Sequence, residues 1–433
     1  MKTHDLIGIG FGPSNVALAI ALEEQSQRNQ PIDAIFIEKQ PKFAWHKDML
    51  LENTDMQISF LKDLVSLRNP CSHYTFINYL HEKGRLQEFI NLKTFFPSRL
   101  EFNDYLSWAA GHFTNQSTYG ETVLEILPEK QGTEVNSLRV ISKDSNGRII
   151  ERKGHNLVLG VGGSANIPDC FKILQNNPNI FHSSQYLRKI EELKDARRIA
   201  IIGAGQSAAE IFLDLHGRAN APQVDLIMRG RAMHPSDDSP SVNAIFDAEF
   251  TDYVYDRSPI ERKQLLEEFH HTNYAAPDID QIDQIFQILY NQKVSGQRRH
   301  KLLNRHAILR PIAIDNSITL ELNNLDTQEF SSNNYDAVIL ATGYTRQDHK
   351  ALLAPLAPYL QDFSVDRNYR LNSTENFKPS IFLQGACEDS HGLSDTLLSV
   401  MAVRSQEIST ALSTPQIKEA QPTHNREQKK EIA

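Results

Sequence analysis

One local design occurs twice in this chain and restricts its fold more than any other feature. Residues 4–24 read HDLIGIGFGPSNVALAIALEE, and residues 197–217 read RRIAIIGAGQSAAEIFLDLHG. Each stretch is a short apolar strand, a glycine turn and a helix with small residues on one side. Such units are typical of Rossmann domains, in which the turn approaches a dinucleotide pyrophosphate. Two copies in 433 residues predict two such domains.

The first turn contains Gly8, Gly10 and Gly12, with Pro13 where the usual fingerprint has a third glycine or alanine. We expect Gly8 to permit the tight turn and Gly10 to let a pyrophosphate approach the backbone. Pro13 is compatible with a nucleotide site, because a proline in the first helical turn loses no hydrogen bond and has a helical φ. The turn therefore predicts an intact site.

Polar residues beside this turn support the same prediction. Ser14 and Asn15 follow the proline and are expected to offer hydrogen-bond donors to phosphates at the helix N-terminus. Glu38 ends the next strand, where it is placed to accept a ribose hydroxyl. The alternative is a glycine turn that holds no ligand, but here strand, helix and acid stand in register.

The second turn has the G-x-G-x-x-A form, with Gly203, Gly205 and Ala208. Its next strand ends at Arg229, with Arg231 nearby and no acid at that place. An acid there would bind a 2′-hydroxyl, whereas an arginine suits a 2′-phosphate, so the sequence favours NADPH over NADH. The alternative for Arg229 is a solvated surface side chain.

Composition excludes several classes of function. The net charge of −9 argues against a nucleic-acid partner. Cys71, Cys170 and Cys387 lie far apart and form no Cys-x-x-Cys pair, which excludes a redox dithiol of that kind and predicts no metal site. The chain has no apolar run long enough to cross a bilayer and no leader after Met1, so we expect a cytoplasmic protein.

The order of apolar strands and helical stretches predicts an α/β fold. It consists of two Rossmann-like dinucleotide-binding domains with largely parallel sheets and a smaller, mostly helical substrate-binding insertion. Two dinucleotide sites without a dithiol indicate a flavoprotein that passes electrons to oxygen or to an external acceptor. The expected parts are an FAD-binding domain of residues 1–165 and 340–410, an NADPH-binding domain of residues 166–235 and 297–339, the insertion of residues 236–296, and a flexible tail of residues 411–433.

Several long stretches resemble one enzyme family. They include WHKDMLLENTDMQISFLKDLVSLRNP (45–70), EFNDYLSWAA, DDSPSVNAIF, DAVILATGY and SHGLSDTLLSV, together with the GFGPSN turn. These stretches resemble the microbial N-hydroxylating flavin monooxygenases, and among them the L-ornithine N5-monooxygenases of hydroxamate siderophore biosynthesis. The resemblance implies that NADPH reduces FAD, that O2 forms a C4a-hydroperoxyflavin, and that a primary amine attacks it to give a hydroxylamine. It implies a homotetramer and no dedicated catalytic side chain.

The resemblance also implies which residues meet the substrate. Lys62 matches a lysine that contacts the ornithine carboxylate, and Asn243 and Asn273 match two asparagines that flank the substrate. Ser399 matches a serine near the polar end of the substrate. The alternatives are a salt bridge from Lys62 to Asp63 or Asp55, and turn or helix caps for the asparagines.

Other residues match cofactor positions. The resemblance places Trp45, His46 and Gln57 around the isoalloxazine. It places Gln206 and Ser207 at the second turn, near the nicotinamide and its phosphates. It places Thr342 in a turn that closes a nucleotide domain, and Leu393 and Ser394 in a C-terminal segment that approaches the flavin.

Two stretches depart from the ornithine enzymes. NYAAPDIDQ and NPCSHY replace Ser-Val-Val and Pro-Thr-Ser-Pro types of sequence near the presumed substrate end. Lysine, putrescine or cadaverine therefore remain alternative substrates, although a diamine would leave Lys62 without a counter-ion. An NADPH oxidase-type flavoprotein without an amine substrate and a non-catalytic flavin-binding regulator are further alternatives.

Overall fold

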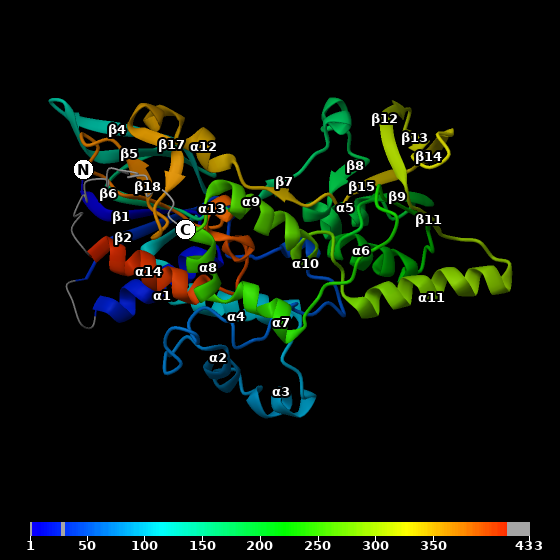
Figure 1. Ribbon diagram of the computed structural model, residues 1–433, viewed down its shortest axis with the longest axis horizontal. Coiled ribbons are helices and arrows are strands. Elements are labelled where there is room, and N and C mark those ends of the chain that lie inside the picture. The colour runs from blue at the N-terminus through cyan, green and yellow to red at the C-terminus, as the bar shows by residue number, and fades with distance from the viewer. Residues whose placement is uncertain (1, 27–30, 414–433) are drawn as a thin grey trace, which may run out of the picture.

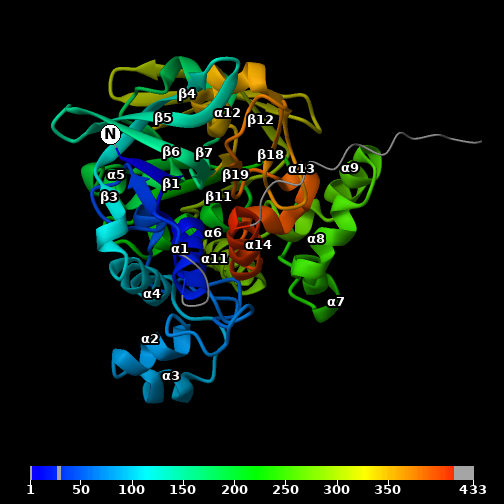
Figure 2. The same cartoon turned by 90° about the vertical axis from the view of Figure 1, so that its left-hand side faces the viewer.

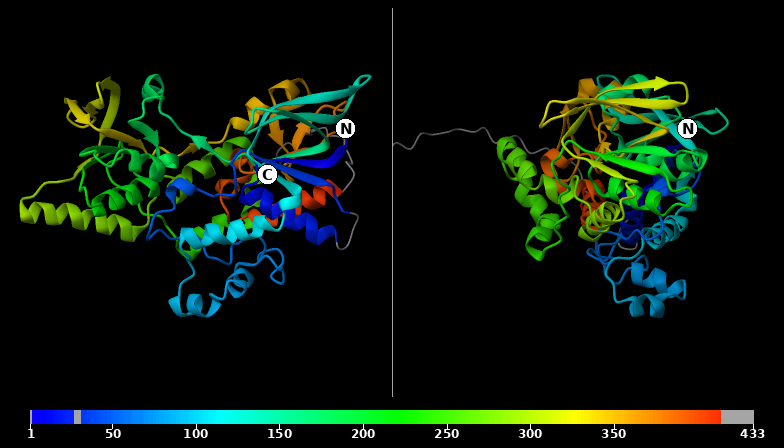
Figure 3. Two further views of the ribbon diagram at one scale, coloured as in Figure 1. Left: turned by 180° about the vertical axis from the view of Figure 1, so that it is seen from behind. Right: turned by 90° about the vertical axis from the view of Figure 1, so that its right-hand side faces the viewer.

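The computed structural model describes residues 2–26 and 31–413. They form two lobes, each built on its own sheet, which Figure 1 shows side by side and Figure 3 shows from behind. The predicted tail from residue 414 onward lies outside the described residues, while residues 411–413 belong to the last helix.

The first lobe is built on a seven-stranded sheet in the order β3-β2-β1-β6-β5-β4, with β19 also paired to β6. Its parallel strands are β1 (Thr3–Ile9), β2 (Ala34–Glu38), β3 (Ser117–Tyr119), β6 (Ile149–Leu159) and β19 (Ile381–Leu383). The antiparallel strands are β4 (Glu121–Gln131) and β5 (Glu134–Asp144). The β4–β5–β6 meander was not predicted, because its alternating apolar residues are interrupted by charged ones.

Helices cover the first sheet beside the glycine turn. They are α1 (Pro13–Ser26), α4 (Arg99–Gly111) and α14 (Met401–Ser413). Residues 16–22 of α1 are all buried, because α14 packs on it from one side and α4 from another. Two short helices, α2 (Phe76–Glu82) and α3 (Leu86–Leu92), project from this lobe in Figure 2.

The second lobe has a fully parallel sheet in the order β11-β10-β9-β15-β8. Its strands are β8 (Ile180–His182), β9 (Arg198–Ile202), β10 (Gln223–Ile227), β11 (Lys301–Leu303) and β15 (Ala337–Leu340). Helices α5 (Tyr186–Glu192), α6 (Gln206–Gly217) and α11 (Ile279–Ser295) pack on one face. An antiparallel meander that the sequence did not suggest covers the other face: β12 (His306–Ile314), β13 (Ser317–Asn324) and β14 (Phe330–Tyr335).

The predicted insertion is helical. It contains α7 (Pro240–Asn243), a 3-10 turn η5 (Ala244–Phe246), α8 (Ala248–Tyr255), α9 (Pro259–Glu268), α10 (His270–Asn273) and then α11. Helices α8 and α9 pack on α13 (Glu388–His391), and η5 packs on the turn η7 (Leu393–Thr396). The insertion therefore starts from the second lobe and lies against the C-terminal segment of the first.

The remaining elements connect these parts. Strands β7 (Ser164–Ala165) and β16 (Tyr344–Thr345) pair antiparallel where the chain passes between the lobes. The others are η1 (Lys47–Met49), η2 (Thr114–Gln116), η3 (Asp169–Leu174), η4 (Ser183–Gln185), α12 (Asp348–Leu352), η6 (Ala354–Tyr359), β17 (Leu360–Val365) and β18 (Leu371–Ser373).

Candidate active site

A cavity of about 670 Å³ lies at the carboxyl ends of the parallel strands of the first sheet. It is lined by the first glycine turn, the end of β2, residues 44–47, residues 160–163 and residues 395–398. Ligands of open α/β sheets bind at this place, beyond the carboxyl ends of the strands. The cavity is therefore the candidate site for a dinucleotide.

The three glycines of the first turn differ in their packing and backbone conformation. Gly8 lies within β1, and a Cβ there would meet the Phe36 ring at 2.1 Å. The turn itself is made at Gly10, which has φ +83° and whose Cβ would lie 2.4 Å from the Gly160 carbonyl oxygen. A Cβ at Gly12 would meet nothing within 4 Å, although Gly12 lines the cavity. The prediction that Gly8 makes the turn is wrong, because close packing on Phe36 and not backbone freedom requires a glycine there.

Ser14 and Asn15, the polar residues at the start of α1, lie in different surroundings. Pro13 is the first residue of the helix and, like Ser14, lines the cavity. The Asn15 side chain points inward, where its amide donates to the Gly10 carbonyl at 2.6 Å and its oxygen accepts from Gln384 at 2.7 Å. The Asn15 side chain is therefore not available to phosphates, since its amide already holds the turn closed.

Glu38 is buried at the end of β2 and lines the cavity. One carboxylate oxygen accepts the backbone N–H of Phe11 at 2.8 Å, and the other accepts that of Gln40 at 2.8 Å. These bonds fix the plane of the carboxylate and leave each oxygen with a further lone pair. The position agrees with an acceptor for ribose hydroxyls.

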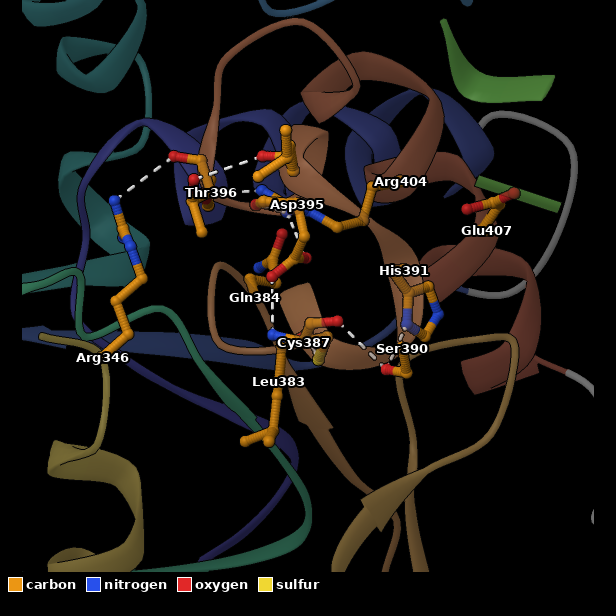
Figure 4. Close-up of polar contacts among 12 residues, drawn as sticks. Arg346, Leu383, Gln384, Cys387, Ser390, His391, Asp395, Thr396, Arg404 and Glu407 are labelled. Atoms are coloured by element: carbon orange, nitrogen blue, oxygen red, sulfur yellow. Dashed lines mark hydrogen bonds and ion pairs between the residues drawn. The ribbon is translucent and has the colours of Figure 1, made fainter. Parts of the chain in front are cut away.

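A buried ion pair that the sequence did not reveal lies beside the same turn (Figure 4). Arg404 of α14 is 1% exposed and donates to the Asp395 carboxylate at 2.9 Å and to the Ser14 hydroxyl at 3.1 Å. The other Asp395 oxygen accepts the backbone N–H of Cys387 at 2.6 Å. Arg404 and Asp395 both line the cavity. The available signal in the sequence was an arginine that follows three apolar residues in MAVRS.

Unsatisfied atoms in the cavity wall test whether a dinucleotide fits. The Gln384 side-chain oxygen and the Arg404 Nε are buried, and neither has a hydrogen-bond partner among the described residues. Both residues line the cavity. Buried polar atoms without partners are rare in proteins, and hydroxyls and phosphates of a bound nucleotide would satisfy such a donor and acceptor. The residues present therefore fit FAD.

Aromatic residues gather where the cavity approaches the second lobe. The rings of Trp45 and His46 lie 4.8 Å apart, and His46 lies 6.0 Å from the ring of Tyr344. Desolvation by the surrounding protein lowers the pKa of His46, and repulsion from Arg99 and Arg346 acts in the same direction, although the residue itself is exposed.

The second glycine turn lies against the insertion. Gly203 has φ +146°, and a Cβ there would lie 2.2 Å from the Ala341 carbonyl oxygen. A Cβ at Gly205 would lie 3.3 Å from the Cα of Ala275. Ser207 is half-buried at the start of α6. The second turn does not line the first-lobe cavity.

Two predicted cofactor residues share one partner. The side-chain amides of Gln57 and Gln206 donate to the Asp278 carboxylate at 2.8 Å and 2.9 Å. Gln57 does not line the cavity. The structure thus brings these two glutamines together through a residue that the sequence did not indicate.

The arginines after β10 differ in their contacts. Arg231 pairs with Asp326 at 2.9 Å, and Arg305 pairs with the same carboxylate at 3.0 Å. Arg229 is exposed, and its guanidinium makes no hydrogen bond or ion pair within residues 2–26 and 31–413. Arg229 is therefore the arginine available to a 2′-phosphate.

Three other predicted cofactor residues do not line the cavity. The Thr342 hydroxyl donates to the Asn166 carbonyl at 2.5 Å, beside the β7–β16 crossing. Leu393 and Ser394 are buried in η7 and do not line the cavity, whereas Asp395 and Thr396 do.

Lys62 and Asn243 lie in one neighbourhood. The Lys62 ammonium lies 3.5 Å from the carboxylate of Asp247, just after η5, and the Asp247 side chain is 60% exposed. The alternatives of a salt bridge to Asp63 or Asp55 are wrong, since Asp63 accepts backbone N–H bonds and neither acid pairs with the lysine. Asn243 ends α7, where its amide donates to the Asp238 carbonyl at 2.8 Å.

Asn273 and Ser399 have free polar atoms. The Asn273 side chain makes no hydrogen bond in the described part of the chain, and the Ser399 hydroxyl is buried without a partner there. Neither residue lines the cavity. Next to Asn273, the Tyr274 hydroxyl donates to Glu388 of α13, which ties the insertion to the C-terminal segment.

Two features are absent from the described residues. They contain no helix long and apolar enough to span a membrane. They also contain no group of three or more histidine, cysteine, aspartate or glutamate residues that could hold a metal ion.

Comparison with known proteins gives consistent matches. The family described as L-lysine 6-monooxygenase/L-ornithine 5-monooxygenase matches residues 2–346. The L-ornithine N(5)-monooxygenase of Pseudomonas aeruginosa is 49% identical over 413 residues, which cover 94% of this chain and 93% of the relative. A solved ornithine hydroxylase from the same organism superposes with a TM-score of 0.92 at 49% identity, covering 95% of this chain and 99% of that chain. A Kutzneria ornithine N-hydroxylase solved with reduced FAD, NADP+ and L-ornithine has a TM-score of 0.89 at 33% identity, with coverages of 95% and 99%.

Proposed function

The chain belongs to the L-lysine 6-monooxygenase/L-ornithine 5-monooxygenase family, and on this basis we propose that it hydroxylates the side-chain amine of L-ornithine. It is an FAD- and NADPH-dependent monooxygenase, and the product is N5-hydroxy-L-ornithine for a hydroxamate siderophore. The observation that carries the proposal is the 49% identity over 94% of the chain to a relative with this activity in its name. The 94% of the chain that is covered spans the insertion that we expect to bind the substrate.

We place FAD in the cavity of the first lobe. The N-terminus of α1 and the open face of Gly12 would receive the phosphates, and Glu38 would accept a ribose hydroxyl. Arg404 would add a buried cation next to Ser14. FAD held by these residues would supply the chemistry of the reaction, namely acceptance of a hydride from NADPH and activation of O2.

We place NADPH at the second glycine turn. Gly203, Gly205 and the start of α6 offer the phosphate site, and Arg229 offers an unpaired guanidinium to the 2′-phosphate. Gln206 and Ser207 lie at the first turn of that helix. The domain boundaries given from the sequence remain predictions.

We place the amino acid between the first lobe and the insertion. Lys62 would bind the carboxylate, because its pair with Asp247 is long and partly exposed and is therefore weak. Asn243, Asn273 and Ser399 would supply hydrogen bonds to the polar groups. A poorly solvated site lowers the pKa of the amine, which must be neutral to act as a nucleophile. The homotetramer and the cytoplasmic location remain predictions.

The substrate is tested by a panel of amines. Enzyme, FAD, NADPH and O2 are incubated with ornithine, lysine, putrescine or cadaverine, and the hydroxylamine formed is measured against the NADPH consumed. We expect ornithine to give the highest coupled rate. A diamine ranking above ornithine contradicts the proposal, and NADPH consumption that no amine changes supports the oxidase alternative.

Lys62→Ala separates the substrate site from the cofactor sites. We expect the KM for ornithine to rise by about tenfold or more, since a charge-assisted bond contributes about 1.5–3 kcal/mol. Flavin reduction by NADPH should stay near normal. Equal loss of flavin reduction would place Lys62 in the cofactor site instead.

A further inference from the structure

Asp278 is the residue on which three parts of the chain converge. It belongs to the insertion and directly precedes α11. One carboxylate oxygen accepts from Gln57 of the first lobe at 2.8 Å and from Ser236 at 3.4 Å. The other oxygen accepts from Gln206 of the second lobe at 2.9 Å. The carboxylate therefore joins both lobes and the insertion.

The backbone of Asp278 strengthens the same contact. Its N–H donates to the side-chain oxygen of Gln206 at 2.9 Å, so that both ends of the Gln206 amide are bonded to one residue. Such a pair of bonds fixes the orientation of the amide. Gln206 is the first residue of α6, directly after the second glycine turn.

The Asp278 carboxylate does not serve its helix. Aspartate is among the preferred N-cap residues, and Asp278 occupies the N-cap position of α11. Its side chain nevertheless makes no capping hydrogen bond. The Asp278 carboxylate therefore does not stabilise the N-terminus of α11 and instead bonds to side chains of the two lobes.

A buried ion pair reaches the same glutamine from the other side. Gln206 also donates to Glu210 at 2.8 Å, and Glu210 pairs with Arg99 of the first lobe at 2.6 Å. The Glu210 side chain is fully buried and that of Arg99 is 14% exposed. Two polar chains, one through Asp278 and one through Glu210, therefore connect the first lobe to the start of α6.

We infer that Asp278 is a positioning residue that holds the second glycine turn in register with the first lobe for hydride transfer from NADPH to FAD. It acts through Gln57 and Gln206, whose amides it orients, and needs no contact with either nucleotide. The inference rests on the proposed assignment of the two nucleotides to the two lobes. It adds no chemical step to the reaction.

Asp278→Asn is the sharpest variant, because it keeps the size of the side chain and removes one of its two acceptor oxygens. Asp280→Asn is the matched control, since Asp280 is exposed in the first turn of α11 and its side chain makes no hydrogen bond or ion pair among the described residues. Flavin reduction by NADPH is followed anaerobically, without an amine. NADP+ affinity is measured by titration of the FAD-loaded protein, and thermal unfolding is recorded for each variant.

We expect Asp278→Asn to slow flavin reduction at saturating NADPH about tenfold, with the Kd for NADP+ and the Tm changed little. In a Gln57→Leu background the same substitution should have a much smaller effect, because the two residues act as one unit. Asp280→Asn should match the wild-type protein. A reduction rate of Asp278→Asn within twofold of the control overturns the inference, as does a slower rate that adds fully to that of Gln57→Leu.

A lower Tm with a proportionate loss of FAD would instead assign Asp278 a structural role only. Failure of the ornithine proposal is distinguishable, because flavin reduction is measured without amine. If wild-type protein reduces flavin with NADPH but forms no hydroxylamine from any amine, the substrate proposal fails while the test of Asp278 remains valid.

Discussion

Removing the buried cation Arg404 should destabilise the first lobe and weaken FAD binding. Arg404→Met keeps much of the volume and deletes the donors to Asp395 and Ser14. The Asp395 carboxylate is fully buried and would keep only the backbone N–H of Cys387. Breaking a buried ion pair from one side costs about 3–5 kcal/mol, because it leaves an uncompensated charge. We expect a loss of about 4 kcal/mol in the free energy of unfolding.

Tryptophan fluorescence reports this lobe selectively. The two tryptophans of the chain, Trp45 and Trp108, both lie in the first lobe. Urea unfolding of the FAD-free protein followed by this signal therefore measures its stability without a contribution from the second lobe, which matters because a two-lobed protein need not unfold in one step.

Two further variants test the cause. Asp395→Asn added to Arg404→Met removes the stranded charge and keeps an acceptor for Cys387, so the double variant should regain about half of the loss or more. Lys378→Met breaks an exposed pair with Glu134 and should change stability by about 1 kcal/mol or less. A single variant within about 1 kcal/mol of wild type, or a double variant less stable than the single one, would refute the reasoning.

Three other predictions follow from the structure. Gly12→Ala should leave the fold intact and weaken FAD binding, because the added Cβ would lie in open space at the cavity wall. Gly8→Ala should lower the Tm, because the added Cβ would lie 2.1 Å from the Phe36 ring. FAD titration and thermal unfolding of both variants separate the two effects. Arg229→Ala should raise the KM for NADPH about tenfold and leave the KM for NADH unchanged. The control Arg231→Ala should change neither KM, since the Arg231 guanidinium is already paired with Asp326. If Arg229→Ala raised both KM values equally, a contact with the 2′-phosphate would be contradicted. Burial lowers the pKa of His391 to about 4, so as the pH falls the unfolded chain takes up a proton on this residue before the folded protein does. The free energy of unfolding should therefore decrease by about 3 kcal/mol for this residue as the pH falls from about 6.5 towards 4. Urea unfolding between pH 4.5 and 7.5 should show a shallower pH dependence for His391→Asn than for the wild-type protein.

The sequence alone determined the features that depend on neighbours along the chain. Both strand–turn–helix units, Glu38 at the end of β2 and the helical insertion follow from apolar period, glycine placement and strand ends. The extended resemblance to one family is also a property of the sequence, and it pointed to the chemistry before any fold was known. The two antiparallel meanders escaped prediction because their strands mix charged and apolar residues and owe their burial to the sheets they join.

Only the tertiary structure decided which polar groups meet. Arg404 reaches Ser14 across 390 positions, and Gln57 reaches Asp278 across 221, so no local pattern marks either pair. Asn15, adjacent to the glycine turn in sequence, turned out to hold that turn instead of facing the cavity. The physical reason is that a buried donor or acceptor must find a partner in space, and the folded chain alone fixes which partner lies within hydrogen-bonding distance.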